Sequence, residues 1–127
     1  MLILPNGTTQ VIPTGDYAAG THQSPVASLQ AAQSHITIMA DRNSWPDTGA
    51  DVVSLTCDIS FDGGSTFSFL AGFTARGGNL TNPFTGQPQT ISSFSISVPQ
   101  IGNANRQLRL NATLSTALNT AASVTVS

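Results

Sequence analysis

Residues that could act as acids, bases, nucleophiles or metal ligands are few in this chain and widely spaced. There are six aspartates, no glutamate, two histidines and one cysteine. Hydrolysis of a glycosidic bond needs two carboxyl groups that face each other across a cleft. Most of the aspartates instead lie at predicted turns, where aspartate is common for conformational reasons. They are Asp16, Asp41, Asp47, Asp51, Asp58 and Asp62.

One segment, Asp41–Asp51, contains three aspartates and Asn43, and their oxygens could surround a hard cation. It lacks the central glycine and the terminal glutamate of an EF-hand loop. The favoured interpretation is a turn that is capped by its own side chains. Cation binding by this loop is the alternative that the sequence leaves open.

A hydrolytic triad would need a histidine beside an activated serine. His22 and His35 are present, but no Gly-x-Ser-x-Gly segment exists to strain and expose a serine nucleophile. Neither histidine has thiolate or carboxylate neighbours at the spacing of a zinc site. Cys57 has the same phase as Leu55 and Ile59, which predicts a small buried hydrophobic residue. We therefore expect no enzymatic activity, no catalytic residue, no cofactor and no resident metal.

The sharpest motif runs from Ser60 to Phe67 and matches the pattern Ser/Thr-x-Asp-x-Gly-x-Thr-Trp/Phe. Its aspartate can accept backbone N–H groups in a tight turn, and its glycine can adopt a positive φ. The motif therefore predicts a hairpin in which the aromatic ring folds across the strands. The residues at its defined positions are Ser60, Asp62, Gly64, Thr66 and Phe67.

This motif resembles the Asp box of sialidase-like propellers, where it recurs once per blade away from the active site. A propeller needs several blades of about forty residues each. The box occurs once in these 127 residues, so a structural turn is favoured over a ligand-binding role for Asp62 and over a fragment of an Asp-box hydrolase.

Alternation of apolar and polar residues predicts the strands. Residues 53–61 have apolar side chains at every odd position, and residues 107–114 have them at every even position. Weaker alternation covers residues 35–40, 93–98 and 124–126, and shorter strands are expected at 11–12 and near Val26 and Leu29. We interpret Leu29–Ser34 as an extended link. Turn-forming clusters, of which one is Pro13–Gly15, separate the strands.

These features predict an all-β protein with a single antiparallel β-sandwich domain over residues 1–127, of about seven or eight strands. Alternation alone does not distinguish a jelly-roll from an immunoglobulin-like strand order. Residues 1–10 begin with an apolar run and are interpreted as a possible docking arm. Three aromatic residues in or beside loops are possible contact residues: Trp45, Tyr17 and Phe84.

Composition restricts the partners. Charged residues make up 8% of the chain, against about 25% in an average soluble domain. The formal net charge is −2 and the four arginines are scattered, which argues against nucleic acid. The apolar runs are far shorter than the ~20 residues that span a bilayer, and the first residues do not read as a signal peptide. We expect no membrane partner, and assembly in a cytoplasm.

Several segments between Ile36 and Gly78 together resemble small phage-encoded β-sandwich proteins. They are Trp45-Pro46, the alternating strand 53–60, the Asp box, Gly72-Phe73-Thr74 and Gly77-Gly78. Those proteins usually close the box with tryptophan, where this chain has Phe67. The resemblance implies a non-enzymatic structural protein of a bacteriophage virion, a capsid decoration or cement subunit on the capsid exterior. Its partners would be the major capsid protein and neighbouring copies of itself.

The alternative function is a carbohydrate-binding or host-adhesion module of a phage tail or fibre. Such a module would use loop aromatics together with asparagine and aspartate hydrogen bonds to hold a glycan.

Overall fold

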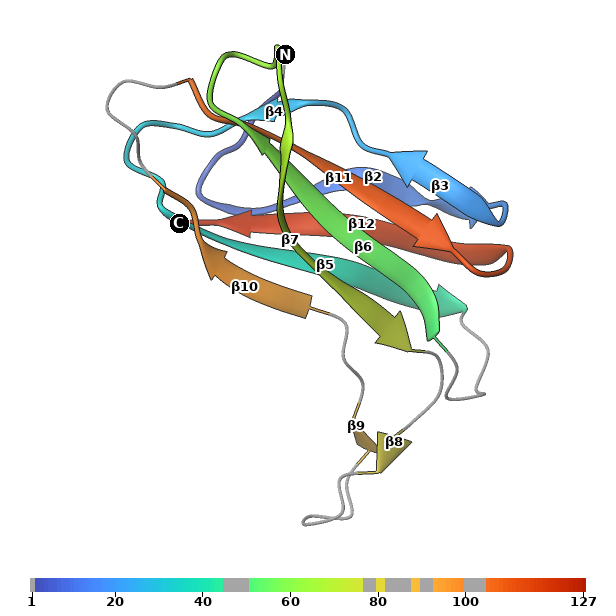
Figure 1. Cartoon of the computed structure of the whole chain (residues 1–127). Helices are drawn as coiled ribbons and strands as arrows, with labels where there is room; N and C mark the ends of the chain where they lie inside the picture. Colours follow the sequence, from blue (N-terminus) through green and yellow to red (C-terminus); the bar gives the residue numbers. More distant parts are fainter. Residues whose placement is uncertain (1, 45–50, 77–79, 82–87, 90–92, 100–104) are drawn as a thin grey trace.

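The computed structural model describes residues 2–44, 51–76, 80–81, 88–89, 93–99 and 105–127. Every regular element in these residues is a β-strand, and two sheets pack face to face (Figure 1). The predicted all-β antiparallel sandwich is therefore confirmed. In this part of the chain, no helix is long and apolar enough to cross a membrane.

We call the two large sheets sheet A and sheet B. Sheet A contains β1 (Leu2–Ile3), β3 (Gly20–Gln23), β4 (Ala27–Ser28), β6 (Asp51–Ser60), β7 (Ser68–Arg76) and β11 (Gln107–Leu114). Sheet B contains β2 (Gly7–Tyr17), β5 (His35–Ser44), β10 (Ser93–Ser97) and β12 (Leu118–Val126). A separate two-stranded ladder joins β8 (Leu80–Thr81) to β9 (Pro88–Gln89).

The strand pairs are nested from the two ends of the chain inward. β2 pairs with β12, β3 and β4 pair with β11, β5 pairs with β10, and β6 pairs with β7, all antiparallel. Along the chain, the strands of the two large sheets alternate between the sheets except at β3–β4 and at the central β6–β7 hairpin. An immunoglobulin-like sandwich would instead keep its first two strands together in one sheet. The nested order is that of a jelly roll, which resolves the choice that alternation left open.

β3 and β4 act as two halves of one interrupted strand along β11. Pro25 lies between them and cannot donate to the ladder. Ser24 bridges the gap, because its N–H donates to Leu110 O at 2.9 Å and its Oγ accepts from Leu110 N at 2.8 Å. Counted in this way, the jelly roll has eight principal strands, in agreement with the predicted number.

One apolar cluster fills the space between the sheets, and the predicted alternation supplies most of it. The odd residues from Val53 to Ile59 are each no more than 3% exposed, and the even residues from Leu108 to Leu114 and from Ile36 to Ala40 are each no more than 4% exposed. Phe61 is half-buried and packs against the same cluster. Phe94 differs from the prediction: it is 40% exposed because β10 is at the edge of sheet B.

The first long strand is more extensive than the sequence predicted. Pro13–Gly15, predicted as a turn, lies inside β2. A β-bulge opposite Ala122 shifts the register there, so that Val11 and Ile12 are both buried although they are adjacent in sequence. A proline is tolerated because β2 is an edge strand of its sheet.

The first residues also differ from the predicted docking arm, because they pack on their own chain. β1 pairs in parallel with β4, and the Leu4 side chain is fully buried in the core. Leu4 N–H donates to Ser28 O at 2.9 Å, and Gln33 Nε2 donates to Leu4 O at 2.9 Å. Leu2 and Ile3 keep exposed side chains.

The link Leu29–Ser34 is extended apart from one turn, in which Gln33 N–H donates to Gln30 O at 3.1 Å. The buried Arg106 fastens this turn, since its guanidinium donates to Gln30 O at 2.8 Å and to Ala31 O at 3.3 Å. These contacts hold the link against the start of β11.

Candidate interaction surface on sheet A

The Asp box forms the turn between β6 and β7 with the hydrogen bonds that its sequence predicts. Asp62 Oδ1 accepts from the N–H groups of Ser65 and Thr66, both at 3.0 Å, and from Ser60 Oγ at 2.7 Å. Asp62 Oδ2 accepts from the Thr66 hydroxyl. Ser60 Oγ in turn accepts from Gly64 N–H at 2.9 Å. Both Asp62 oxygens therefore support the turn.

The same hydrogen bonds fix the charge state of Asp62. Donation from the Ser60 and Thr66 side chains lowers the pKa of the Asp62 carboxyl well below its usual range. A general acid must carry a proton near neutral pH. Asp62 is instead ionised near neutral pH, as its role in the turn requires.

Substituting Asp62 is expected to alter both stability and its dependence on pH. Asp62→Ala removes both acceptor oxygens of Asp62 and should lower Tm, whereas Asp62→Asn keeps one carbonyl oxygen and should lower it less. Because the folded pKa lies below the unfolded value of about 3.9, the wild-type carboxylate stabilises the fold above that pH and loses this effect as pH falls. Urea unfolding across acidic pH should show a shallower decline for Asp62→Asn. Superimposable pH profiles would contradict the assigned role.

The turn folds back over the beginning of β11. Asp62 forms an isolated bridge with Asn105, and Gly63 N–H approaches Asn105 O at 3.4 Å. Ser60 and Gln107 were predicted on the solvent-facing side of their strands, but the turn covers both, and each is no more than 2% exposed. Gly64 sits directly against the Gln107 side-chain oxygen.

Beyond the turn, Phe67 lies against a cation on the outer side of sheet A. The Arg109 guanidinium carbon is 4.1 Å from the centre of the Phe67 ring, a cation–π contact. Arg109 Nε is also 3.4 Å from Asp58 Oδ2, and both side chains are partly exposed. The Asp box therefore places an aromatic ring on an arginine that is already oriented by an aspartate.

A chain of amides extends this contact across the sheet. Asn111 Nδ2 donates to Asp58 Oδ2 at 2.9 Å, and Gln23 Nε2 donates to Asn111 Oδ1 at 2.7 Å. These residues come from β3, β11 and β6, which are neighbours in sheet A. These hydrogen bonds hold the side chains on this part of the outer side in fixed orientations. The charges of Arg109 and Asp58 compensate each other.

Phe69 is the most exposed large apolar residue of the described chain, at 69%. It pairs with Asp58 across the ladder, and its ring lies close to Gly72, since a Cβ built there would be 3.4 Å from Phe69 Cε2. A glycine at this point lets the ring rest on the sheet. We call Asp58, Phe67, Phe69, Arg109 and Asn111 the Phe69 face.

The outer side of sheet B has a different chemistry. Thr8, Thr125, Thr37 and Ser95 form one row across all four strands. Their hydroxyls pair with each other, Thr8 with Thr125 at 2.8 Å and Thr37 with Ser95 at 2.7 Å. Because these hydroxyls already form hydrogen bonds with each other, a partner would gain little free energy by replacing the water around them. The two outer faces of the sandwich are therefore unequal.

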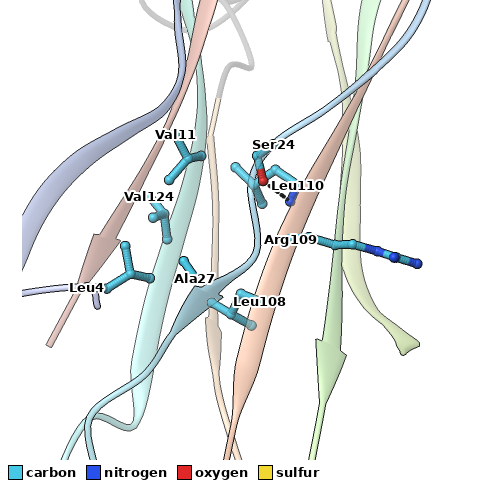
Figure 2. Close-up of a pocket in the computed structure, with 8 residues that line it drawn as sticks. All are labelled: Leu4, Val11, Ser24, Ala27, Leu108, Arg109, Leu110 and Val124. Atoms are coloured by element: carbon cyan, nitrogen blue, oxygen red, sulfur yellow. Dashed lines mark hydrogen bonds between the residues drawn. The ribbon is translucent and has the colours of Figure 1, made fainter. Parts of the chain in front are cut away.

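The interior holds no space for a ligand at the gap drawn in Figure 2. That cavity measures about 10 Å³, room for roughly one water molecule. Leu4, Leu108 and Leu110 are among the apolar side chains that line it, while the Arg109 side chain points away from it to the opposite side of β11 (Figure 2). The gap is a packing defect of the core.

Several groups of the described residues that could have carried chemistry are hydrogen-bonded or buried. Burial raises the pKa of the Cys57 thiol to about 12, and its side chain is fully enclosed between the sheets. In the described part of the chain, no three histidine, cysteine or acidic side chains gather as metal ligands. His22 Nε2 donates a hydrogen bond to Ala18 O at 2.8 Å, and Asp41 accepts one from Ser123 Oγ at 2.6 Å.

Of the three predicted contact residues, Tyr17 is the one that the structure describes. Its hydroxyl donates to Pro13 O, its ring packs over Gly15, and the His22 ring lies 5.0 Å away. Tyr17 thus covers the end of the sandwich between β2 and β3. Trp45 and Phe84 lie outside the described residues, as does most of the predicted cation loop.

The sequence matches no protein-family profile and no curated protein. Solved structures do align with it, among them two from infectious bursal disease virus. The first, VP2 of infectious bursal disease virus in a subviral particle, is 12% identical with a TM-score of 0.46, and covers 94% of this chain and 31% of VP2. The second, from the Gx strain of that virus, is 16% identical with a TM-score of 0.44, and covers 94% and 32% respectively. This chain therefore spans about a third of either protein.

Sequence reasoning identified Phe67 as a turn residue but missed its contact with Arg109 and missed Phe69 altogether. The signal for Arg109 was present, since it shares the solvent-facing phase of its strand with Asn111. Phe69 was hidden because a bulge between Cys57 and Asp58 changes the phase of β7 relative to β6. Without that register, the sequence does not show whether an apolar residue of β7 faces solvent or the core.

Proposed function

We propose that this chain is a non-enzymatic structural subunit of a bacteriophage particle, a capsid decoration or cement subunit that binds the outer shell. The observation that carries the proposal is the inequality of the two outer faces. Sheet A offers exposed Phe69 across the ladder from Asp58, the residue that orients Arg109, whereas sheet B offers paired hydroxyls. A subunit that covers a shell needs one adhesive face and one face that remains in solvent.

The residue types of the Phe69 face suit a protein partner. Aromatic residues and arginine are enriched at the energetic centres of protein interfaces. Many symmetric copies on one particle would also let a modest contact per subunit give lasting attachment. The partners in this proposal are the major capsid protein and neighbouring copies of the chain, assembled in the host cytoplasm.

Strand order supports the proposal by analogy of fold. Double-sheet jelly rolls recur in viral capsid and lectin domains, although a fold alone does not determine a function. The lectin precedent, with the flat exposed ring of Phe69, keeps glycan binding by a tail or fibre module as the second candidate. In that case the ring would stack on a sugar and the amides of the Phe69 face would bind hydroxyls.

The test compares attachment of two surface variants to particles of the phage that encodes the chain. Phe69→Ala should reduce the amount that co-sediments with purified particles by about tenfold or more, the effect of losing an interface hot spot. Ser95→Ala, on the opposite face, should attach like the wild type. Retention of Phe69→Ala at the wild-type level would overturn the proposal. Glycan-array binding that Phe69→Ala abolishes would favour the second candidate.

A further inference from the structure

The turn between β1 and β2 contains a chemically reactive pair. Asn6-Gly7 is the single Asn-Gly sequence in the chain. Both residues are exposed, and no heavy atom lies within 4 Å of the place where a Gly7 side chain would be. No heavy atom beyond the adjoining residues therefore crowds the Gly7 Cα, which is next to the nitrogen that would attack Asn6. Gly7 also has φ of 110°, a conformation that other residues rarely adopt.

A buried amide is aimed at the reacting group. Gln33 is 3% exposed, and its Oε1 accepts from Gln30 N–H at 2.7 Å, which fixes the orientation of the side chain. Its Nε2 donates to Leu4 O and, at 3.0 Å, to Asn6 Oδ1. A donor at this oxygen stabilises the negative charge that develops when the side-chain carbonyl is attacked.

We propose that Asn6 is a site of spontaneous deamidation in the folded protein, with Gln33 as the residue that promotes it. The Gly7 backbone nitrogen loses its proton and attacks Asn6 Cγ, forming a C–N bond. The Cγ–Nδ2 bond breaks and ammonia leaves, which gives a five-membered succinimide. Water then opens the ring on either side to give aspartate or isoaspartate, so that asparagine and water become an acid and ammonia.

Other residues that could form the same ring are less reactive than Asn6. Asp62-Gly63 could form the same ring, but Asp62 is ionised and both its oxygens accept hydrogen bonds. A carboxylate in that state is a poor electrophile. Asn111 and Asn119 are followed by alanine and threonine, whose side chains hinder ring closure, and the amides of both are already hydrogen-bonded to aspartates.

Deamidation of Asn6 would affect the segment between Leu4 and Gly7. Leu4 is anchored in the core, and Gly7 begins the ladder with β12. An isoaspartyl residue inserts an extra backbone carbon between these two anchors. This product should therefore loosen Leu4 and add a negative charge beside Gln33. The inference does not depend on the proposed function.

The test is incubation of the purified full chain at mildly alkaline pH, followed by peptide mapping that separates asparagine, aspartate and isoaspartate, with ammonia assayed in parallel. Asn6 should convert well ahead of Asn111 and Asn119, and Asn6→Gln should abolish the early ammonia. Gln33→Met should slow conversion about five- to tenfold, as expected for loss of one hydrogen bond.

A second measurement covers the case in which Gln33→Met does not fold. Wild-type chain unfolded in urea lacks the Gln33 contact, so Asn6 should convert no faster there than in the folded chain. Conversion in urea that greatly exceeds the folded rate, or an unchanged rate in folded Gln33→Met, would overturn the role of Gln33. An Asn6 that persists while other asparagines react would overturn the site itself.

Discussion

Replacing Gly64 by alanine is expected to lower the free energy of unfolding by about 2–4 kcal/mol, since it combines backbone strain with a clash. Gly64 has φ of 95°, which a side chain disfavours, and an added Cβ would lie 2.5 Å from Gln107 Oε1. Gln107 is buried beneath the turn and has little room to move aside. Urea unfolding of the variant, monitored by circular dichroism, measures the loss.

The neighbouring glycine provides the matched control. Gly63 also has a positive φ, of 75°, but the nearest atom to its added Cβ is Asn105 Nδ2 at an ordinary 3.7 Å. Gly63→Ala should therefore cost only the backbone strain, about 1–2 kcal/mol. Equal effects of the two substitutions would show that the contact between the turn and β11 does not matter.

Leu4→Ala is the second substitution with a large expected effect, a loss of about 2–4 kcal/mol of unfolding free energy. Leu4 is completely buried and already borders the small cavity of Figure 2, so the deletion enlarges an existing void. Loss of this anchor should also free β1 from β4. Hydrogen exchange at Leu4 N–H, which now donates to Ser28 O, should become faster.

Leu2→Ala, in the adjoining strand β1, is the control. The Leu2 side chain is 38% exposed, and truncating it should cost less than about 1 kcal/mol. If Leu4→Ala were as mild as Leu2→Ala, the result would contradict the anchoring of Leu4 in the core and would favour the docking arm that the sequence suggested.

Local patterns predicted the strands and the Asp-box turn well, because both depend on residues that are close in sequence. The alternation around Cys57 follows from strand geometry alone. The hydrogen bonds of Asp62 span at most four residues, so the motif contains all that is needed to predict them.

The sequence could not predict effects of distant segments. Burial of Gln107 results from a turn more than forty positions earlier, and burial of both Val11 and Ile12 results from a bulge set by β12. The jelly-roll order likewise depends on pairing between the two ends of the chain. These outcomes are decided by tertiary packing, which overrides the local pattern.

The candidate surface was predicted least well. Loop aromatics were favoured as contact residues, yet Tyr17 is used to close the end of the sandwich. The exposed ring is Phe69, in the middle of a sheet face. Aromatic residues fill cores as readily as they form contacts, so their role becomes visible once the register of β6 and β7 is known.

The most direct test of the proposed shell subunit is its copy number in purified virions. Quantitative mass spectrometry would measure this chain against the major capsid protein in particles of the phage to which the proposal assigns it. The proposal predicts a fixed, symmetry-related ratio with many copies per particle. A handful of copies confined to the tail, or absence from the virion, would contradict it.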